Sequence, residues 1–134
     1  MLEIKFKPIG MVKVLDEDNK ISKIIIFRDF VDGLRGLDEY SHLYIIYYFH
    51  LNEGKGYSLL VHPMGRRDLP LVGVFATRSP YRPNLVGLSI VELLRLDNDG
   101  LLVKNLDALD GTPVLDIKPV IERVEVLKLP EWIR

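Results

Sequence analysis

Apolar and polar residues alternate with a period of two along much of the chain, which is typical of half-buried β-strands. The alternation is clear near both ends, in residues 2–7 and in residues 120–126. The regular succession of strands and long helices that marks a parallel, doubly wound sheet does not occur. The pattern therefore predicts an all-β protein with strands at both ends of the chain.

Three pairs of apolar runs flank short polar turns and predict β-hairpins. A run that is apolar on both faces, residues 44–49, predicts a strand that is central or covered on both sides. Residues 30–37 contain two glycines and predict a short helical turn that only connects strands. We expect a mostly antiparallel β-barrel with a few short helical turns. The paired runs are residues 11–15 with 21–27, 42–51 with 57–62, and 88–96 with 101–106.

Composition agrees with one globular domain spanning residues 1–134, because 48% of the residues are hydrophobic and 28% are charged. No apolar run approaches the roughly 20 residues needed to span a bilayer, so we expect no membrane segment. The first residues lack the apolar stretch of a signal peptide, and the chain has no cysteine. We therefore expect a cytoplasmic protein without disulfides.

Charge is distributed unevenly although the net charge is only −1. Residues 55–82 carry five basic side chains against Asp68, a balance of +4, which leaves −5 for the rest of the chain. Such asymmetry can steer an anionic ligand to one face of a protein. The alternative is that these are ordinary solvating charges.

The sequence favours neither a metal site nor the common nucleotide-binding and hydrolase motifs. His42 and His50 lie eight residues apart on one predicted strand, about 26 Å at about 3.3 Å per residue, and cannot share an ion. His62 lies several residues from His50 in the predicted hairpin. Gly-x-Gly-x-x-Gly, Gly-Lys-Ser/Thr and Gly-x-Ser-x-Gly are absent from the sequence.

Two segments have an unusual composition. In residues 73–89, two prolines stiffen a loop that carries Arg78 and Arg82, which would suit a carboxylate or phosphate ligand. The alternative is that these arginines pair with Asp107 or Asp110. In residues 106–119 those two aspartates flank a glycine turn, where they could receive a cation or hydroxyl groups, or simply cap the turn.

These stretches identify a resemblance to the TrmO family of tRNA methyltransferases, also called TsaA-like or YaeB-like proteins. The resemblance covers nearly the whole chain, and its longest motifs are Ala-Thr-Arg-Ser-Pro-x-Arg-Pro-Asn in residues 76–84 and Asp-Gly-Thr-Pro-Val-x-Asp-Ile-Lys-Pro in residues 110–119. The family implies a β-barrel that binds S-adenosyl-L-methionine at a homodimer interface. It also implies methylation of N6 of the threonylcarbamoyl-adenosine beside the tRNA anticodon.

Carried over by motif, the methyl-donor contacts fall on eight residues. In this interpretation Arg78 takes the methionyl carboxylate, and the aspartates accept hydrogen bonds from the ribose and amine groups. His50 and Asp110 are the catalytic candidates; His50 either accepts a proton or only binds the donor. The eight donor contacts are Phe49, His50, Arg78, Leu88, Asp107, Ala108, Leu109 and Asp110.

The basic segment suggests where tRNA would bind. Arg66, Arg67 and Arg82 are predicted to form a tRNA-facing patch separate from the donor pocket, because Arg66 and Arg67 lie in a loop flanked by Gly and Pro. The alternative is that they are exposed, solubilising arginines. A competing hypothesis for the whole protein is a non-catalytic module that binds S-adenosyl-L-methionine or RNA.

Overall fold

The computed structural model describes residues 2–123 and 127–133, which contain short strands and single turns of 3-10 helix. Within this part of the chain no helix has the length and apolar character needed to cross a membrane. The helices are η1 (Arg28–Leu34), η2 (Leu37–Glu39), η3 (His50–Asn52), η4 (Pro63–Gly65) and η5 (Val74–Ala76). The strands are β1 (Gly10–Asp16), β2 (Ile21–Ile26), β3 (His42–Tyr48), β4 (Leu60–Val61), β5 (Val72–Gly73), β6 (Val86–Asp97), β7 (Gly100–Lys104) and β8 (Pro113–Pro119).

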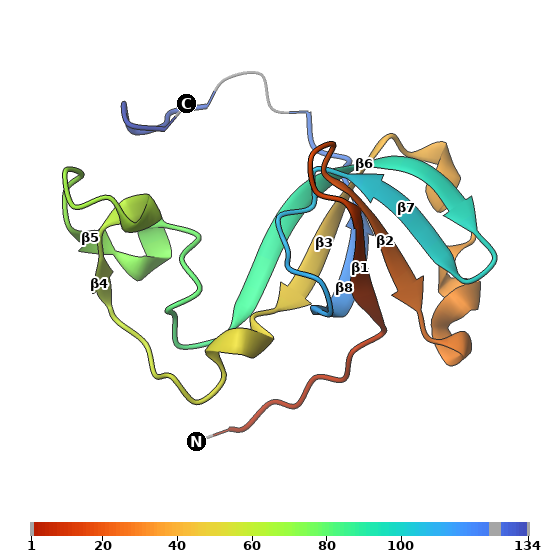
Figure 1. Cartoon of the computed structure of the whole chain (residues 1–134), viewed down its shortest axis with the longest axis horizontal. Helices are drawn as coiled ribbons and strands as arrows, with labels where there is room; N and C mark the ends of the chain where they lie inside the picture. The colour runs from red at the N-terminus through yellow and green to blue at the C-terminus, as the bar shows by residue number, and fades with distance from the viewer. Residues whose placement is uncertain (1, 124–126, 134) are drawn as a thin grey trace.

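Six antiparallel strands pair in the order β1-β2-β7-β6-β3-β8, and β8 pairs back with β1, which closes the barrel (Figure 1). The first and third predicted hairpins are confirmed as β1–β2 and β6–β7. Strand β3 is central, as predicted, because β6 and β8 flank it. The prediction of mostly antiparallel strands with short helical turns is therefore confirmed.

The barrel interior is filled by side chains from all six strands. Alternate residues along β2 and β3 point inward, so their burial has the period of two that the sequence shows. Leu34 and Leu37, from η1 and η2, also join this core. The segment at residues 30–37 therefore does more than connect strands, because it contributes buried side chains to the core. The barrel residues with at most 1% exposure are Val12, Ile24, Leu43, Ile45, Val91, Leu101, Val103 and Val114.

The second predicted hairpin is wrong. Strand β3 ends at Tyr48 and the chain turns into η3, while β4 pairs with β5 in a separate two-stranded sheet. Figure 1 shows this sheet with η4 and η5 to one side of the barrel. The physical reason is that both edges of β3 are already bonded to β6 and β8, so no edge is free for residues 57–62. We call residues 53–85 the side lobe.

The predicted terminal strands are also wrong where the structure describes them. Residues 2–9 and 120–123 form no strand, and Leu2, Ile4 and Phe6 are exposed. Residues 124–126 of the second prediction lie outside the described residues. Alternation alone does not make a strand, because a strand also needs a partner with free backbone donors and acceptors.

Candidate functional site

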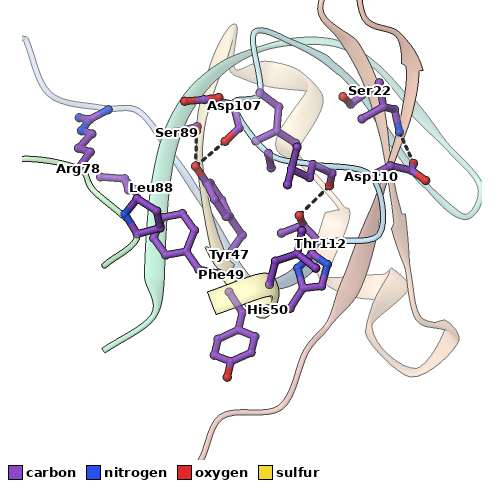
Figure 2. A pocket seen from close by; sticks show the side chains of 18 of the residues that line it. Ser22, Tyr47, Phe49, His50, Arg78, Leu88, Ser89, Asp107, Asp110 and Thr112 are labelled. Carbon is purple, nitrogen blue, oxygen red and sulfur yellow. Dashed lines mark hydrogen bonds between the residues drawn. The ribbon is translucent and has the colours of Figure 1, made fainter. Parts of the chain in front are cut away.

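A cavity of about 990 Å³ opens between the barrel, the side lobe and the loop that precedes β8. It is lined by all eight residues predicted to contact a methyl donor, although they come from four separate segments of the chain. In the view of Figure 2, Arg78 and Leu88 lie on one side of the aromatic pair, and Asp110 and Thr112 lie on the other. The fold therefore brings the predicted donor residues together in one place.

Two aromatic rings form the central wall of this cavity. Tyr47 and Phe49 stack edge to face with ring centroids 5.6 Å apart. Gly87 lies opposite Tyr47 in the β3–β6 ladder, and a Cβ atom there would approach within 2.5 Å of the Tyr47 ring and 2.8 Å of the Phe49 ring. The rings can occupy this position only because residue 87 has no side chain.

The Tyr47 hydroxyl joins the barrel to the loop that precedes β8. It donates to the backbone carbonyl of Asp107 at 2.7 Å, and the Ser89 hydroxyl lies 3.1 Å away (Figure 2). Since the phenol has one proton and the carbonyl takes it, Ser89 donates to Tyr47. Burial raises the pKa of Tyr47 above its usual value, so the phenol keeps this proton at neutral pH.

The segment from Asp107 to Thr112 is fixed by several hydrogen bonds. Besides the Tyr47 contact, the Asp110 carboxylate accepts the backbone N–H of Val14 at 2.8 Å, and the Thr112 hydroxyl donates to the carbonyl of Leu109 at 2.6 Å. One oxygen of Asp110 therefore bonds strand β1 and not the glycine turn beside it. Asp107 and Asp110 themselves stay exposed at the cavity, where their carboxylates can accept hydrogen bonds.

The loop that carries Arg78 and Arg82 lies across the cavity from Asp110 and Thr112 (Figure 2). Arg78 is exposed and lines the cavity, whereas Arg82 is half-buried and bonded to backbone carbonyls of its own loop. In the described part of the chain, neither arginine forms an ion pair with Asp107 or Asp110. Ion pairs between the arginines and these aspartates, the alternative raised by the sequence, therefore do not hold the loop in place.

His50 begins η3, directly after Phe49 and at the point where β3 leaves the barrel. The backbone N–H of Phe49 donates to the carbonyl of Leu85 at 2.9 Å, which ties this point to the chain returning from the side lobe. His50 is half-buried and lines the cavity. Of the two possibilities raised by the sequence, a ligand-contacting histidine and a histidine at a strand end, its position agrees with both.

Arg66 and Arg67 lie outside the cavity, in the side lobe after η4. Arg66 makes a two-point contact with Asp68, with Nη2 2.5 Å from Oδ2 and Nε 3.2 Å from Oδ1. Arg67 is exposed. Arg82, predicted to belong with them, instead lines the cavity. Within residues 2–123 and 127–133, no cluster of His, Asp and Glu has the arrangement of a metal site.

Sequence reasoning missed four residues of the site: Tyr47, Gly87, Ser89 and Thr112. Tyr47 appeared to be an ordinary core residue of an apolar strand, and only its polar hydroxyl hinted at a hydrogen-bond partner inside the protein. A β-bulge between β3 and β8 falls at Ile46 and Tyr47. Such irregularities often re-aim side chains beside functional sites, but a bulge formed with a distant strand cannot be seen in one sequence.

The sequence is similar to a known protein family and to several known proteins. Residues 13–126 match the model of the tRNA-methyltransferase O N-terminal domain. A "Probable S-adenosyl-L-methionine-binding protein" of Methanothermobacter thermautotrophicus is 40% identical over 94% of this chain and 96% of its own length. The tRNA (adenine(37)-N6)-methyltransferase of Escherichia coli is 43% identical over 72% of this chain and 43% of its own length.

A solved structure shows the same fold. The crystal structure of TrmO from Pseudomonas aeruginosa superposes with a TM-score of 0.68 at 30% sequence identity, covering 90% of this chain and 57% of that one. The family match covers most of the described chain, including every residue predicted to contact the donor. The chain therefore belongs to the family of the tRNA-methyltransferase O N-terminal domain.

Proposed function

We propose that this protein transfers a methyl group from S-adenosyl-L-methionine to N6 of the threonylcarbamoyl-adenosine beside the anticodon of a tRNA. One observation carries the proposal: a single cavity gathers the eight predicted donor residues from four segments of the chain. Membership of the family supports it, as do relatives named for binding this donor or for methylating N6 of adenine 37 of tRNA.

The residues around the cavity fit the donor's chemistry. Phe49 and Leu88 offer apolar surface for the adenosine body, and Arg78 is exposed at the cavity, where it can take a carboxylate through two hydrogen bonds. Asp107 and Asp110 present acceptors for the ribose hydroxyls and for the amino group. The volume of about 990 Å³ lies near the upper end of small-molecule sites, which run from about 300 to about 1,000 Å³.

When bound, the donor supplies a methyl group on a positively charged sulfur. The protein's main contribution is positioning, because an in-line displacement needs the attacking nitrogen aligned with the methyl carbon. A carbamoylated N6 is more acidic than a free amine, so a strong base is unnecessary. His50 and Asp110 are the proposed catalytic residues, with His50 accepting the proton and the carboxylate of Asp110 lying close to developing positive charge.

We further propose that two copies of the chain form a homodimer with the donor site at their interface. Several large apolar side chains of the side lobe are exposed, among them Leu60, Met64 and Phe75, of which Phe75 is 75% exposed. Large apolar side chains that gather on an exposed region of a protein often mark an interface. Light scattering should give twice the chain mass, and a strict monomer at micromolar concentration that still binds the donor would contradict the interface site.

The proposed tRNA contacts are Arg66 and Arg67, which are exposed in the side lobe. Arg82 is omitted because its guanidinium is half-buried and bonded to backbone carbonyls of its own loop, whereas Arg66 stays exposed beside Asp68. Replacing Arg66 and Arg67 together by Ala should weaken tRNA binding and flatten its salt dependence by up to about two phosphate contacts. An unchanged salt slope would show that tRNA docks elsewhere.

The proposed reaction is tested by incubating the protein with labelled S-adenosyl-L-methionine and tRNA from a strain lacking the activity, followed by nucleoside mass spectrometry. Methylated threonylcarbamoyl-adenosine is the expected product. The second candidate, a donor-binding module without catalysis, is favoured by the name of the full-length Methanothermobacter relative, which states binding alone. Donor binding without any methylated nucleoside would select it.

A further inference from the structure

The Arg82 guanidinium lies inside a curl of its own loop. Its Nη1 donates to the backbone carbonyls of Thr77 at 3.0 Å and Ser79 at 3.1 Å, and lies 3.5 Å from the carbonyl of Val74. In the part of the chain that the structure describes, no carboxylate pairs with Arg82. Its charge is therefore satisfied by converging carbonyl dipoles instead of an acidic side chain.

Two short side chains close the same curl. The Thr77 hydroxyl donates to the carbonyl of Val74 at 2.8 Å and accepts the backbone N–H of Ser79 at 3.2 Å. The Ser79 hydroxyl accepts the backbone N–H of Tyr81 at 3.2 Å. The residues on both sides of Arg78 are thus held by side-chain contacts, and both have their carbonyls bonded to Arg82.

We propose that Arg82 is a positioning residue that fixes the backbone around Arg78, so that the Arg78 guanidinium faces the cavity before any ligand arrives. This inference rests on the proposed donor site and deepens it. An exposed arginine on an ordered backbone loses less conformational freedom on binding than one on a loose loop. The two arginines of this motif therefore have different roles: Arg78 contacts the ligand, and Arg82 holds the loop and does not contact a phosphate.

The first test needs no ligand. Hydrogen exchange of the free protein should show faster exchange at the amides of Ser79 and Tyr81 in Arg82→Ala, by about tenfold or more, because the bonds that protect them depend on the curl. Barrel amides should be unchanged. Arg35→Ala, which removes an exposed arginine between η1 and η2, is the matched control and should leave the loop unchanged. Unchanged loop exchange in Arg82→Ala would overturn the inference.

The second test is a double-mutant cycle read by calorimetric titration with S-adenosyl-L-methionine. Arg82→Ala should weaken binding by about tenfold when Arg78 is present and by less than about twofold in the Arg78→Ala background, because Arg82 acts through Arg78. An equal loss in both backgrounds would overturn the inference. A second result would also overturn it: Arg82→Ala binds the donor as well as wild type, but the salt dependence of its tRNA binding is flattened by about one phosphate contact. Arg82 would then be a phosphate ligand.

Two further results keep the inference testable. If Arg82→Ala does not fold, Arg82→Lys replaces it: lysine keeps the charge but loses the planar donor arrangement, so the same exchange and binding effects should appear in weaker form. Wild-type exchange and affinity in Arg82→Lys would then contradict the inference. If the wild-type protein does not bind the donor, the proposed function fails, and the exchange experiment alone decides whether Arg82 orders the loop.

Discussion

The barrel and the side lobe differ in how much of their apolar side-chain surface is buried. In the barrel, side chains such as Leu43 and Ile45 have no exposed surface, and each strand is bonded on both edges. In the side lobe, only Pro63 and Val74 are buried, and β4 and β5 contain two residues each. The barrel is thus stabilised by its own core, whereas the lobe is held mainly by local hydrogen bonds.

This difference assigns different roles to the two regions. The barrel gives a rigid wall, on which Tyr47 and Phe49 are fixed by packing. The side lobe supplies Arg78 from a loop that has little core beneath it, so the order of this loop depends on hydrogen bonds within it and, in our proposal, on Arg82. Stability should therefore reside in the barrel, and donor affinity should be sensitive to both regions.

The largest expected effect comes from a cavity in the barrel core. Leu43→Ala should lower the free energy of unfolding by about 2 to 5 kcal/mol, because the side chain is fully buried between β6 and β8. The matched variant in the side lobe, Leu71→Ala, should change it by no more than about 0.5 kcal/mol, since Leu71 is 53% exposed. Denaturant unfolding measures both, and equal losses would contradict the comparison.

A smaller effect is expected from Gly87→Ala. The added methyl would meet the Tyr47 ring at 2.5 Å, so ring or strand must shift, at a cost of about 1 to 3 kcal/mol. In the side lobe, Gly73→Ala is the control, because its Cβ would meet nothing within 4 Å and its φ of −62° suits alanine. Thermal unfolding should separate the two variants, and equal melting temperatures would show that the aromatic wall is not tightly packed.

Tyr47→Phe should cost about 1 kcal/mol, since it leaves the carbonyl of Asp107 without its partner. Tyr57→Phe in the side lobe, where the ring is 58% exposed, should be neutral. The difference in free energy of unfolding between wild type and Tyr47→Phe should also depend on pH. The folded pKa of Tyr47 is raised by burial above the ordinary 10.0, so its contribution is complete below pH 10 and is lost as the pH rises through the folded pKa.

Urea unfolding at several pH values between 7 and 11 tests this dependence. Wild type should lose stability above about pH 10 relative to Tyr47→Phe, so the gap between the two proteins should narrow. A gap that stays constant to pH 11 would mean that Tyr47 ionises equally well in the folded and unfolded chains.

The sequence predicted the local parts of the fold better than the distant ones. The hairpins β1–β2 and β6–β7 have short turns, so both strands and their partner choice are visible within about 20 residues. The partners of β3 come from β6 and β8, far along the chain. Periodicity does not specify such pairings, which is why the predicted hairpin of residues 42–51 with 57–62 is wrong.

The candidate site likewise has some residues that the sequence predicts and others that depend on contacts between distant parts of the chain. The unusual composition of two segments and the family resemblance predicted Arg78, Asp107 and Asp110, which the fold brings to one cavity. The need for glycine opposite Tyr47, and the bonds from Arg82 to its own loop, depend on three-dimensional packing. Spacing along the chain could not distinguish an arginine that binds carbonyl oxygens from one that faces a ligand.

The central claim is that the cavity between barrel and side lobe binds S-adenosyl-L-methionine, with Arg78 as one of its contacts. Calorimetric titration of the wild-type protein and of Arg78→Ala tests it most directly. The account predicts binding by the wild type and an affinity about tenfold or more weaker in the variant, because a charge-assisted hydrogen bond is lost. Absence of binding by the wild type, or equal affinity in the two proteins, would contradict it.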